Sequence, residues 1–338
     1  MKLKRIGIDL AKCVFQIHGV DSHEQVKVRK ALKRRQVLDF FRQLEPCLIA
    51  MEACGSAHYW GRELTKLGHE VKLIAPQFVK PYVKSGKNDA NDAEAICEAA
   101  SRPTMRFVAL KTPDQQAGQA LHRVRSRLVR ARTALVNEVR GLLGEFGIIG
   151  TAKGISACRR LIAAVLEDAE SGLPGTMREL LAQRSEELTQ QDAHLAQLDA
   201  RIKQQCREDK RIERLLAIEG IGPISASAMV AAIGDARQFK SGRNLAAWLG
   251  LVPSQHSSGG KERLGAISKR GDTYLRTLLI HGARAVVNAC KDKTDRKSEW
   301  IKALMTRRNK NIATVALANK NARIIWSVLS REESYRTV

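Results

Sequence analysis

Apolar residues alternate with small or polar residues between Arg5 and Lys12. One side of an extended chain carries Ile6, Ile8 and Leu10, and the other carries Gly7, Asp9 and Ala11. This period of two is typical of a half-buried strand. The pattern therefore predicts a strand with one acidic side chain, Asp9, near its middle.

Short apolar runs continue to about residue 85 and alternate between strand and helix patterns. Strands are expected at 14–20, 26–28, 47–52 and 70–74, and helices at 31–44, 57–67 and 78–83. Such alternation is typical of an α/β domain with a parallel core sheet and right-handed crossovers. We expect this domain to span 1–110, with Glu52 at a strand end and with Asp89 and Asp92 on one face of a helix.

The rest of the chain has helical periodicity. One long helix is expected from Pro113 to about Phe146, and a second carries apolar residues at strict sevens: Leu181, Leu188, Leu195 and Ile202. The two most simply form an antiparallel coiled-coil hairpin, with a dimer seam as the alternative, in a linker domain at 111–210. A mostly α-helical domain at 211–338 follows.

Within this last region, helices are expected at 225–233, 272–290 and 299–330, with an irregular loop at 253–263. Gly220-Ile221-Gly222 separates two helical segments and resembles the turn of a helix-hairpin-helix. Two glycines let a backbone approach a phosphate closely, next to the free amides at the start of a helix. An ordinary tight turn between helices is the alternative.

Composition narrows the class of protein. The 338 residues include 58 Lys or Arg against 35 Asp or Glu, a net charge of +23, which favours nucleic acid as the partner. The seven cysteines contain no Cys-x-x-Cys and predict reduced thiols rather than zinc ligands or a disulfide framework. The sequence has no apolar run of membrane-spanning length and no apolar signal core. We therefore expect a cytoplasmic, nucleoid-associated protein.

Positive charge is concentrated in two regions. The first long helix carries six arginines on its polar faces, and residues 261–331 contain 17 Lys or Arg against five Asp or Glu. A run of charge is often only a solvated face, but these runs lack the alternating sign of a self-paired helix. The candidate nucleic-acid contacts are Arg123, Arg125, Arg127, Arg130, Arg132, Gly220, Gly222, Lys261, Arg263, Lys269 and Arg270.

The acids suggest chemistry. Asp9, Glu52 and the pair Asp89 and Asp92 come from three separate elements of one α/β domain that can meet at one edge of the sheet. Four carboxylates suffice to hold two Mg²⁺ or Mn²⁺ ions about 4 Å apart for phosphoryl transfer. Two simpler interpretations remain open at this point: Asp9 as a hydrogen-bonded surface acid, and Asp89 as a helix N-cap.

Three segments resemble one known family. Gly7-Ile8-Asp9-Leu10-Ala11-Lys12, Met51-Glu52-Ala53-Cys54-Gly55 and Asn88-Asp89-Ala90-Asn91-Asp92-Ala93 are similar to the DEDD motif of transposases from the one-ten family of insertion sequences. The Gly220 turn and the segment from Gly250 to Gly259 resemble that family's C-terminal transposase domain. The resemblance implies an RNase H-like (RuvC-like) N-terminal domain and a recombinase that binds donor and target DNA.

The resemblance also implies residue roles. Asp9, Glu52, Asp89 and Asp92 would bind metal, and Ser258 would attack the phosphodiester and become covalently joined to DNA. A noncoding bridge RNA would guide target choice, and a homodimer or homotetramer would act. Ser257 is the nearest rival nucleophile, and His256 could help as a base. The alternatives are a junction endonuclease that uses metal-bound water, and an architectural nucleic-acid-binding protein without catalysis.

Overall fold

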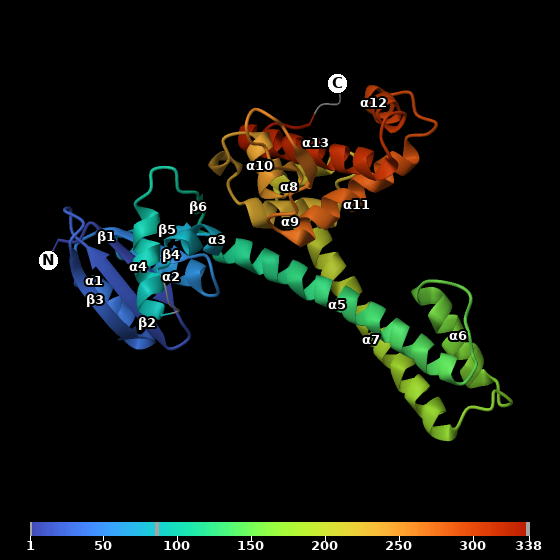
Figure 1. The fold of residues 1–338 in the computed structure, drawn as a ribbon. Helices are drawn as coiled ribbons and strands as arrows, with labels where there is room; N and C mark the ends of the chain where they lie inside the picture. The colour runs from blue at the N-terminus through green and yellow to red at the C-terminus, as the bar shows by residue number, and fades with distance from the viewer. Residues whose placement is uncertain (1, 85–87, 336–338) are drawn as a thin grey trace. The chain divides into compact units, whose positions relative to one another are not determined.

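The computed structural model describes residues 2–84 and 88–335 of the chain (Figure 1). It divides into two compact units, Met1–Asp114 and Gln115–Val338. The finer division of the second unit at residue 210 stays a prediction. Among the described residues, none of the helices has both the length and the apolar composition that a membrane span requires.

The first unit contains a mixed sheet of six strands in the order β3-β2-β1-β4-β5-β6. β1, β4 and β5 are parallel, while β2, β3 and β6 pair antiparallel with their neighbours. The expected α/β architecture of the N-terminal region is thereby confirmed. The strands are β1 (Arg5–Leu10), β2 (Val14–Val20), β3 (Val26–Lys33), β4 (Leu48–Glu52), β5 (Glu70–Ile74) and β6 (Phe107–Val108).

The predicted helix at 31–44 is wrong in its first part. Residues up to Lys33 belong to β3, because Ala31 and Leu32 pair with Gln16 and Phe15 of β2. The sheet pairing overrides the local helical preference of this short segment. The helices of this unit are α1 (Val37–Arg42), α2 (Ala57–Lys66), α3 (Pro76–Val79) and α4 (Asp89–Ala100), with 3-10 turns at Arg34–Gln36 and Lys80–Tyr82.

Three helices begin the second unit: α5 (Pro113–Glu145), α6 (Ile155–Glu167) and α7 (Gly175–Glu208). α5 and α7 run antiparallel, since Arg125 pairs with Asp199 and Arg132 with Asp192 (Figure 1). The seven-residue repeat of α7 is buried within this single chain, with exposed fractions of 0–5% from Leu181 to Ile202. The hairpin interpretation of the repeat is therefore sufficient without a partner chain.

The remaining helices are α8 (Lys210–Leu216), α9 (Pro223–Ile233), α10 (Gly242–Trp248), α11 (Thr273–Ala289), α12 (Arg296–Met305) and α13 (Lys310–Arg331), with a 3-10 turn at Ala236–Gln238. A helical C-terminal region is thus confirmed. The single helix expected at 299–330 is wrong, because Asn309 caps a new helix by accepting a hydrogen bond from the Ile312 amide at 3.0 Å. The segment expected to be irregular at 253–263 forms part of a hairpin between β7 (Pro253–Gln255) and β8 (Leu264–Ile267).

Candidate active site

Gly7 allows α4 to lie directly on β1. A Cβ atom at Gly7 would come within 2.2 Å of the Ala93 carbonyl oxygen and 2.5 Å of the Cys97 amide. Both contacts are far shorter than any that a side chain tolerates, and both involve helix backbone. Gly7, two residues before Asp9 on the same face of the strand, is therefore what permits a helix to cover this face.

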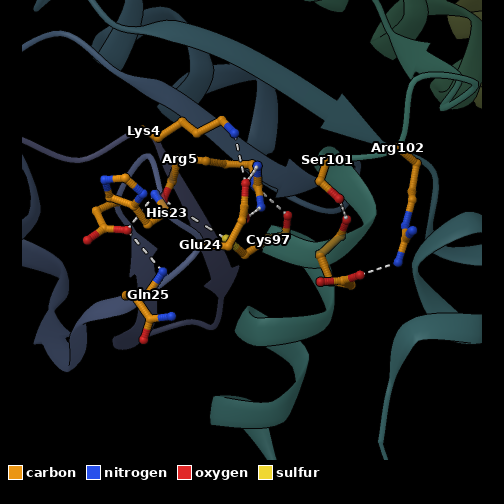
Figure 2. A network of polar contacts seen from close by, with 10 residues as sticks. Lys4, Arg5, His23, Glu24, Gln25, Cys97, Ser101 and Arg102 are labelled. Carbon is orange, nitrogen blue, oxygen red and sulfur yellow. Dashed lines mark hydrogen bonds and ion pairs between the residues drawn. The ribbon is translucent and has the colours of Figure 1, made fainter.

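Arg5 also holds β1 against α4 (Figure 2). Its side chain is 4% exposed, and its Nε donates to the Cys97 carbonyl at 2.7 Å. The guanidinium also forms an ion pair with Glu24 at 2.5 Å. Glu24 in turn forms an ion pair with Lys4 at 2.8 Å. A hydrogen-bonded buried charge is costly to displace, so this network holds α4 in register with β1.

This register brings three carboxylates together. Asp9 lies on β1, and Asp89 and Asp92 lie in the first turn of α4. One oxygen from each of the three lies within 4.8 Å of the other two. The cap of α4 is Asn88, whose side chain accepts from the Ala90 amide at 3.0 Å, so the N-cap interpretation of Asp89 is wrong.

Glu52 lies beside this group and outside its 4.8 Å limit. It ends β4, and the parallel register that pairs Ile8 with Met51 makes Asp9 and Glu52 the next residues along neighbouring strands. Its pKa is raised by burial and then by the charges of Asp9 and Asp92. All four predicted acids therefore belong to one electrostatic neighbourhood.

The acids repel one another. Burial raises the pKa of Asp9 to about 6, with further contributions from the charges of Asp92 and Asp89. Among the described residues, no ion pair neutralises Asp9, Glu52, Asp89 or Asp92. Like charges held close together without a cation cost folding free energy, and such an arrangement is frequent at functional sites.

The donor set fits a hard divalent cation. Mg²⁺ and Mn²⁺ prefer carboxylate oxygens and are held by a few such ligands together with water. Three converging carboxylates with a fourth beside them match this preference, and no sulfur or imidazole lies in the group. The cluster is consistent with the use of a divalent metal.

The second candidate feature is the β7–β8 hairpin. Its turn is Gly259-Gly260, with φ of 56° and 74° at the two central residues. Two consecutive positive φ values are what a two-residue type I′ turn requires, and glycine adopts them without strain. Ser258 lies immediately before this turn and pairs with Lys261 across it.

The hydroxyls of the two adjacent serines differ in their contacts. Ser257 Oγ accepts from the Arg263 amide at 3.2 Å and from Gln255 Nε2 at 3.0 Å. Ser258 Oγ has no hydrogen-bond partner among residues 2–84 and 88–335, and its side chain is exposed. His256 is also exposed; its backbone N–H donates to the Arg263 carbonyl at 3.0 Å, and its ring has no hydrogen-bond partner among the described residues.

Arg276 fixes the base of this hairpin, which the sequence interpretation missed. Its side chain is 7% exposed and donates to the carbonyls of Leu249 at 3.1 Å and Arg270 at 3.0 Å, one on each side of the hairpin. The sequence signal for this role was the position of Arg276 in α11. It lies at helical spacing from Leu279 and Ala283, on the apolar face of the helix. Such an arginine must find carbonyl or acidic partners inside the protein.

Comparison with known proteins shows the family to which the chain belongs. Residues 6–148 match a family model of DEDD transposases, and residues 212–299 match the model described as Transposase IS116/IS110/IS902 family. A probable family 20 transposase of Pseudomonas aeruginosa is 66% identical over 99% of each chain. The chain belongs to the IS110 family of transposases.

Two further relatives carry insertion-sequence names. The transposase for IS1111A of Coxiella burnetii is 47% identical and covers 99% of this chain and 92% of its own. The transposase for IS1328 of Yersinia enterocolitica is 44% identical over 96% of each chain. Membership of the IS110 family identifies the protein as an enzyme of DNA cleavage and strand transfer.

The arginines of α5 in this IS110-family transposase have two different environments. Arg125 and Arg132 are partly buried in ion pairs with Asp199 and Asp192, each at 2.5 Å. Arg123, Arg127 and Arg130 are exposed and form no ion pair with any residue that the structure describes. The three exposed arginines remain available for contacts with phosphate. The two paired arginines instead stabilise the α5–α7 hairpin.

The other predicted nucleic-acid contacts also differ in their environments. Lys261, Arg263, Lys269 and Arg270 are exposed around the serine hairpin. Gly220 has φ of 85° and packs against α11, where its Cβ would meet the Gly282 carbonyl at 2.8 Å. Gly222 is exposed at the start of α9 with open space around its Cα. The need for glycine at 220 is thus explained by helix packing, and Gly222 alone is free to approach a ligand.

Proposed function

We propose that this transposase cuts and rejoins DNA strands through a covalent phosphoserine intermediate, with Ser258 as the nucleophile. The supporting observation is the contrast between the two serines: Ser257 Oγ accepts from two donors, while Ser258 Oγ, beside the Gly259-Gly260 turn, has no hydrogen-bond partner among the described residues. An oxygen whose lone pairs already accept hydrogen bonds is a poorer nucleophile than a free one.

In the proposed reaction, Ser258 Oγ attacks a backbone phosphorus. The Oγ–P bond forms, the bond from phosphorus to one deoxyribose oxygen breaks, and that oxygen leaves as a hydroxyl after taking up a proton. The serine proton passes to water. A hydroxyl of the recipient strand then attacks the same phosphorus and releases Ser258, so the number of phosphodiester bonds is conserved.

The acids form the other half of the proposed site, in an RNase H-like, RuvC-like domain. Asp9, Glu52, Asp89 and Asp92 would hold Mg²⁺ or Mn²⁺, which when bound stabilises the attacking and leaving oxygens of phosphoryl transfer. The carboxylates would orient such ions and so place positive charge where the DNA backbone must approach. The proposal requires Ser258 to reach these acids in the same chain or in a second one.

The decisive experiment asks whether cleaved DNA stays attached to the protein. Labelled DNA is incubated with the full chain, the nucleic acid that co-purifies with it and Mg²⁺, and the mixture is denatured and separated on a gel. We expect a protein–DNA adduct that Ser258→Ala abolishes and that the matched control Ser257→Ala retains. Cleavage that persists without an adduct in Ser258→Ala would instead establish a water-dependent endonuclease, and absence of any metal-dependent cleavage would favour an architectural role.

Mixing two inactive variants tests the assembly. We propose a homodimer or homotetramer, because strand exchange joins two cut ends. If Asp9→Asn and Ser258→Ala chains recover adduct formation when combined, the acids and the serine act from different chains. If each remains inactive in the mixture, both halves act within one chain.

We also propose a noncoding bridge RNA as the guide for target choice. The net charge of +23 and the unpaired arginines of α5 support binding of a polyanion. Phosphate contacts carry no base information, so a guide that pairs with DNA would supply the specificity. Sequencing the nucleic acid that co-purifies from the nucleoid fraction tests this: a single structured RNA supports the guide, and random cellular RNA contradicts it.

A further inference from the structure

An open groove of about 770 Å³ lies between α10, α12 and α13 in the second unit. Its charged and aromatic lining residues include Arg243 of α10, Trp300 of α12, and Lys320 and Arg323 of α13. These residues are separated by up to 80 positions in the sequence, so only the fold brings them together. None of them belongs to the acidic cluster or to the serine hairpin.

The groove is positively charged and lacks an internal counterion. Its lining contains three cations and no acid. In the described part of the chain, no carboxylate pairs with Arg243, Lys320 or Arg323. Nearby Lys297, by contrast, is paired with Glu219 at 3.0 Å. Burial lowers the pKa of Lys320, with the charges of Lys297, Arg296 and Arg323 adding to the effect.

An aromatic ring faces the same space. Trp300 is 36% exposed, and the Lys320 Nζ lies 4.7 Å from its ring centroid. Trp326 plays a different part, because its indole N–H donates to the carbonyls of Ala236 and Phe239 at 3.2 and 3.0 Å. Trp326 is thus a fixed wall, whereas Trp300 has no hydrogen bond to any described residue.

The groove is held in shape by close packing of two helices. A Cβ at Gly242 would lie 2.9 Å from the Arg323 Cα, so the start of α10 touches α13 backbone to backbone. Arg243 follows Gly242 directly. The two arginines are therefore held close together by the fold.

We propose that this groove binds an unpaired nucleic-acid strand. Phosphates would contact Arg243, Lys320 and Arg323, and one base would stack on Trp300. Cations alone fit any polyanion, but an exposed tryptophan among them fits a strand whose bases are free to stack. A duplex keeps its bases paired and offers only phosphates. This site goes beyond the proposed phosphoserine chemistry and does not depend on it.

The test measures binding of the full chain without divalent metal, by fluorescence anisotropy. The probes are labelled oligo-uridine, oligo-thymidine of the same length and a DNA duplex. We expect Lys320→Gln/Arg323→Gln to weaken binding of the single strands about tenfold and to flatten the salt dependence by about two counterions. The matched control Lys203→Gln/Arg207→Gln removes the same charge from an exposed face of α7 and should change binding by about twofold.

The aromatic contribution is tested separately. Trp300→Ala should weaken single-strand binding about tenfold, while Trp300→Phe retains most of it. Circular dichroism and thermal unfolding establish that each variant is folded. Preference for oligo-uridine would identify a guide RNA as the source, and preference for oligo-thymidine a displaced DNA strand; both support the proposal.

Two outcomes overturn it. One is equal weakening by the groove and control double variants, and the other is unchanged single-strand binding in folded Trp300→Ala. Because the assay involves no cleavage, its failure leaves the Ser258 proposal intact. Loss of the covalent adduct in the earlier experiment likewise does not affect this one.

Discussion

Two faces of α4 place carboxylates in opposite electrostatic environments. Asp89 and Asp92 lie with Asp9 in a group that no cation of the described residues neutralises, and the pKa of Asp9 is raised to about 6. Glu94 lies on the other face and pairs with Lys84 at 2.5 Å and Arg29 at 3.1 Å. Its pKa is lowered, first by the hydrogen bond from Lys84.

The difference teaches how to recognise a ligand site in a strongly basic protein. With 58 Lys and Arg in the chain, cations are abundant, and Glu94 has two of them. Asp92, two residues before Glu94, lies with other acids and pairs with no cation in the part of the chain that the structure describes. Repulsion between carboxylates inside a folded protein is frequent at functional sites, and this arrangement is consistent with the use of a divalent metal.

The largest expected effect comes from separating the helix from the strand. Gly7→Ala should unfold the first unit or destabilise it by about 4 kcal/mol, because the added Cβ collides with the α4 backbone. Gly55→Ala is the matched control, since its Cβ would meet nothing within 4 Å and should cost less than about 0.5 kcal/mol. Urea unfolding of both variants measures the difference, and equal stabilities would contradict the close-packing argument.

The next largest effect is a loss of strand cleavage, which is expected for a variant on only one of the two faces of α4. Asp92→Asn should reduce metal-dependent strand cleavage about a thousandfold, because it removes one carboxylate of the proposed metal site. Glu94→Gln leaves that group intact and should retain cleavage within about threefold. Initial rates on labelled DNA compare the two variants at several Mg²⁺ concentrations. Equal losses would mean that α4 contributes only structure.

The sequence was sufficient to predict the acidic group because its members have simple local positions. Asp9 lies in an alternating strand, Glu52 at a strand end, and Asp89 and Asp92 three apart on a helix. The sequence did not predict which residues bring these acids together. Gly7 and Arg5 act through contacts with Cys97, about 90 residues away, and no local pattern encodes that distance.

In the second unit, too, local sequence patterns were predictive and long-range contacts were not. Strict sevens in α7 predicted the buried leucines, but charge pattern alone did not separate paired from free arginines on α5. The hairpin around Ser258 looked irregular because its strands have only three and four residues and are mostly exposed. Its fixation by Arg276 depends on helix α11, which no segment near the serine reveals.

A smaller effect on stability without metal is expected, of opposite sign for Asp9 of the acidic group and for Glu94. With a chelator at pH 7, Asp9→Asn should stabilise the protein by about 1 kcal/mol after allowance for solvent screening, because it removes repulsion. Glu94→Gln should destabilise it by about 0.5 kcal/mol, because it breaks two surface pairs. Thermal unfolding of the chelated proteins measures both.

The pH dependence of that result follows from the pKa directions. Asp9 has a folded-state pKa of about 6, above its ordinary value of 3.8, so its unfavourable charge is fully present above pH 6 and disappears as the pH falls toward 4. The advantage of Asp9→Asn should therefore vanish at pH 4. An advantage that persists at pH 4 would show that the variant acts through packing and not through charge.

The smallest expected effect tests the same contrast between paired and free charges on α5. Arg127 is exposed without an ion pair among the described residues, so Arg127→Gln should weaken nucleic-acid binding about threefold and leave stability unchanged. Arg132 is held by Asp192, so Arg132→Gln should instead cost about 1 kcal/mol of stability and change binding less. Anisotropy and thermal unfolding of both variants separate the two roles. If both arginines lower affinity equally at unchanged stability, pairing with α7 does not remove an arginine from the binding surface, and the paired face of α5 must open when nucleic acid binds.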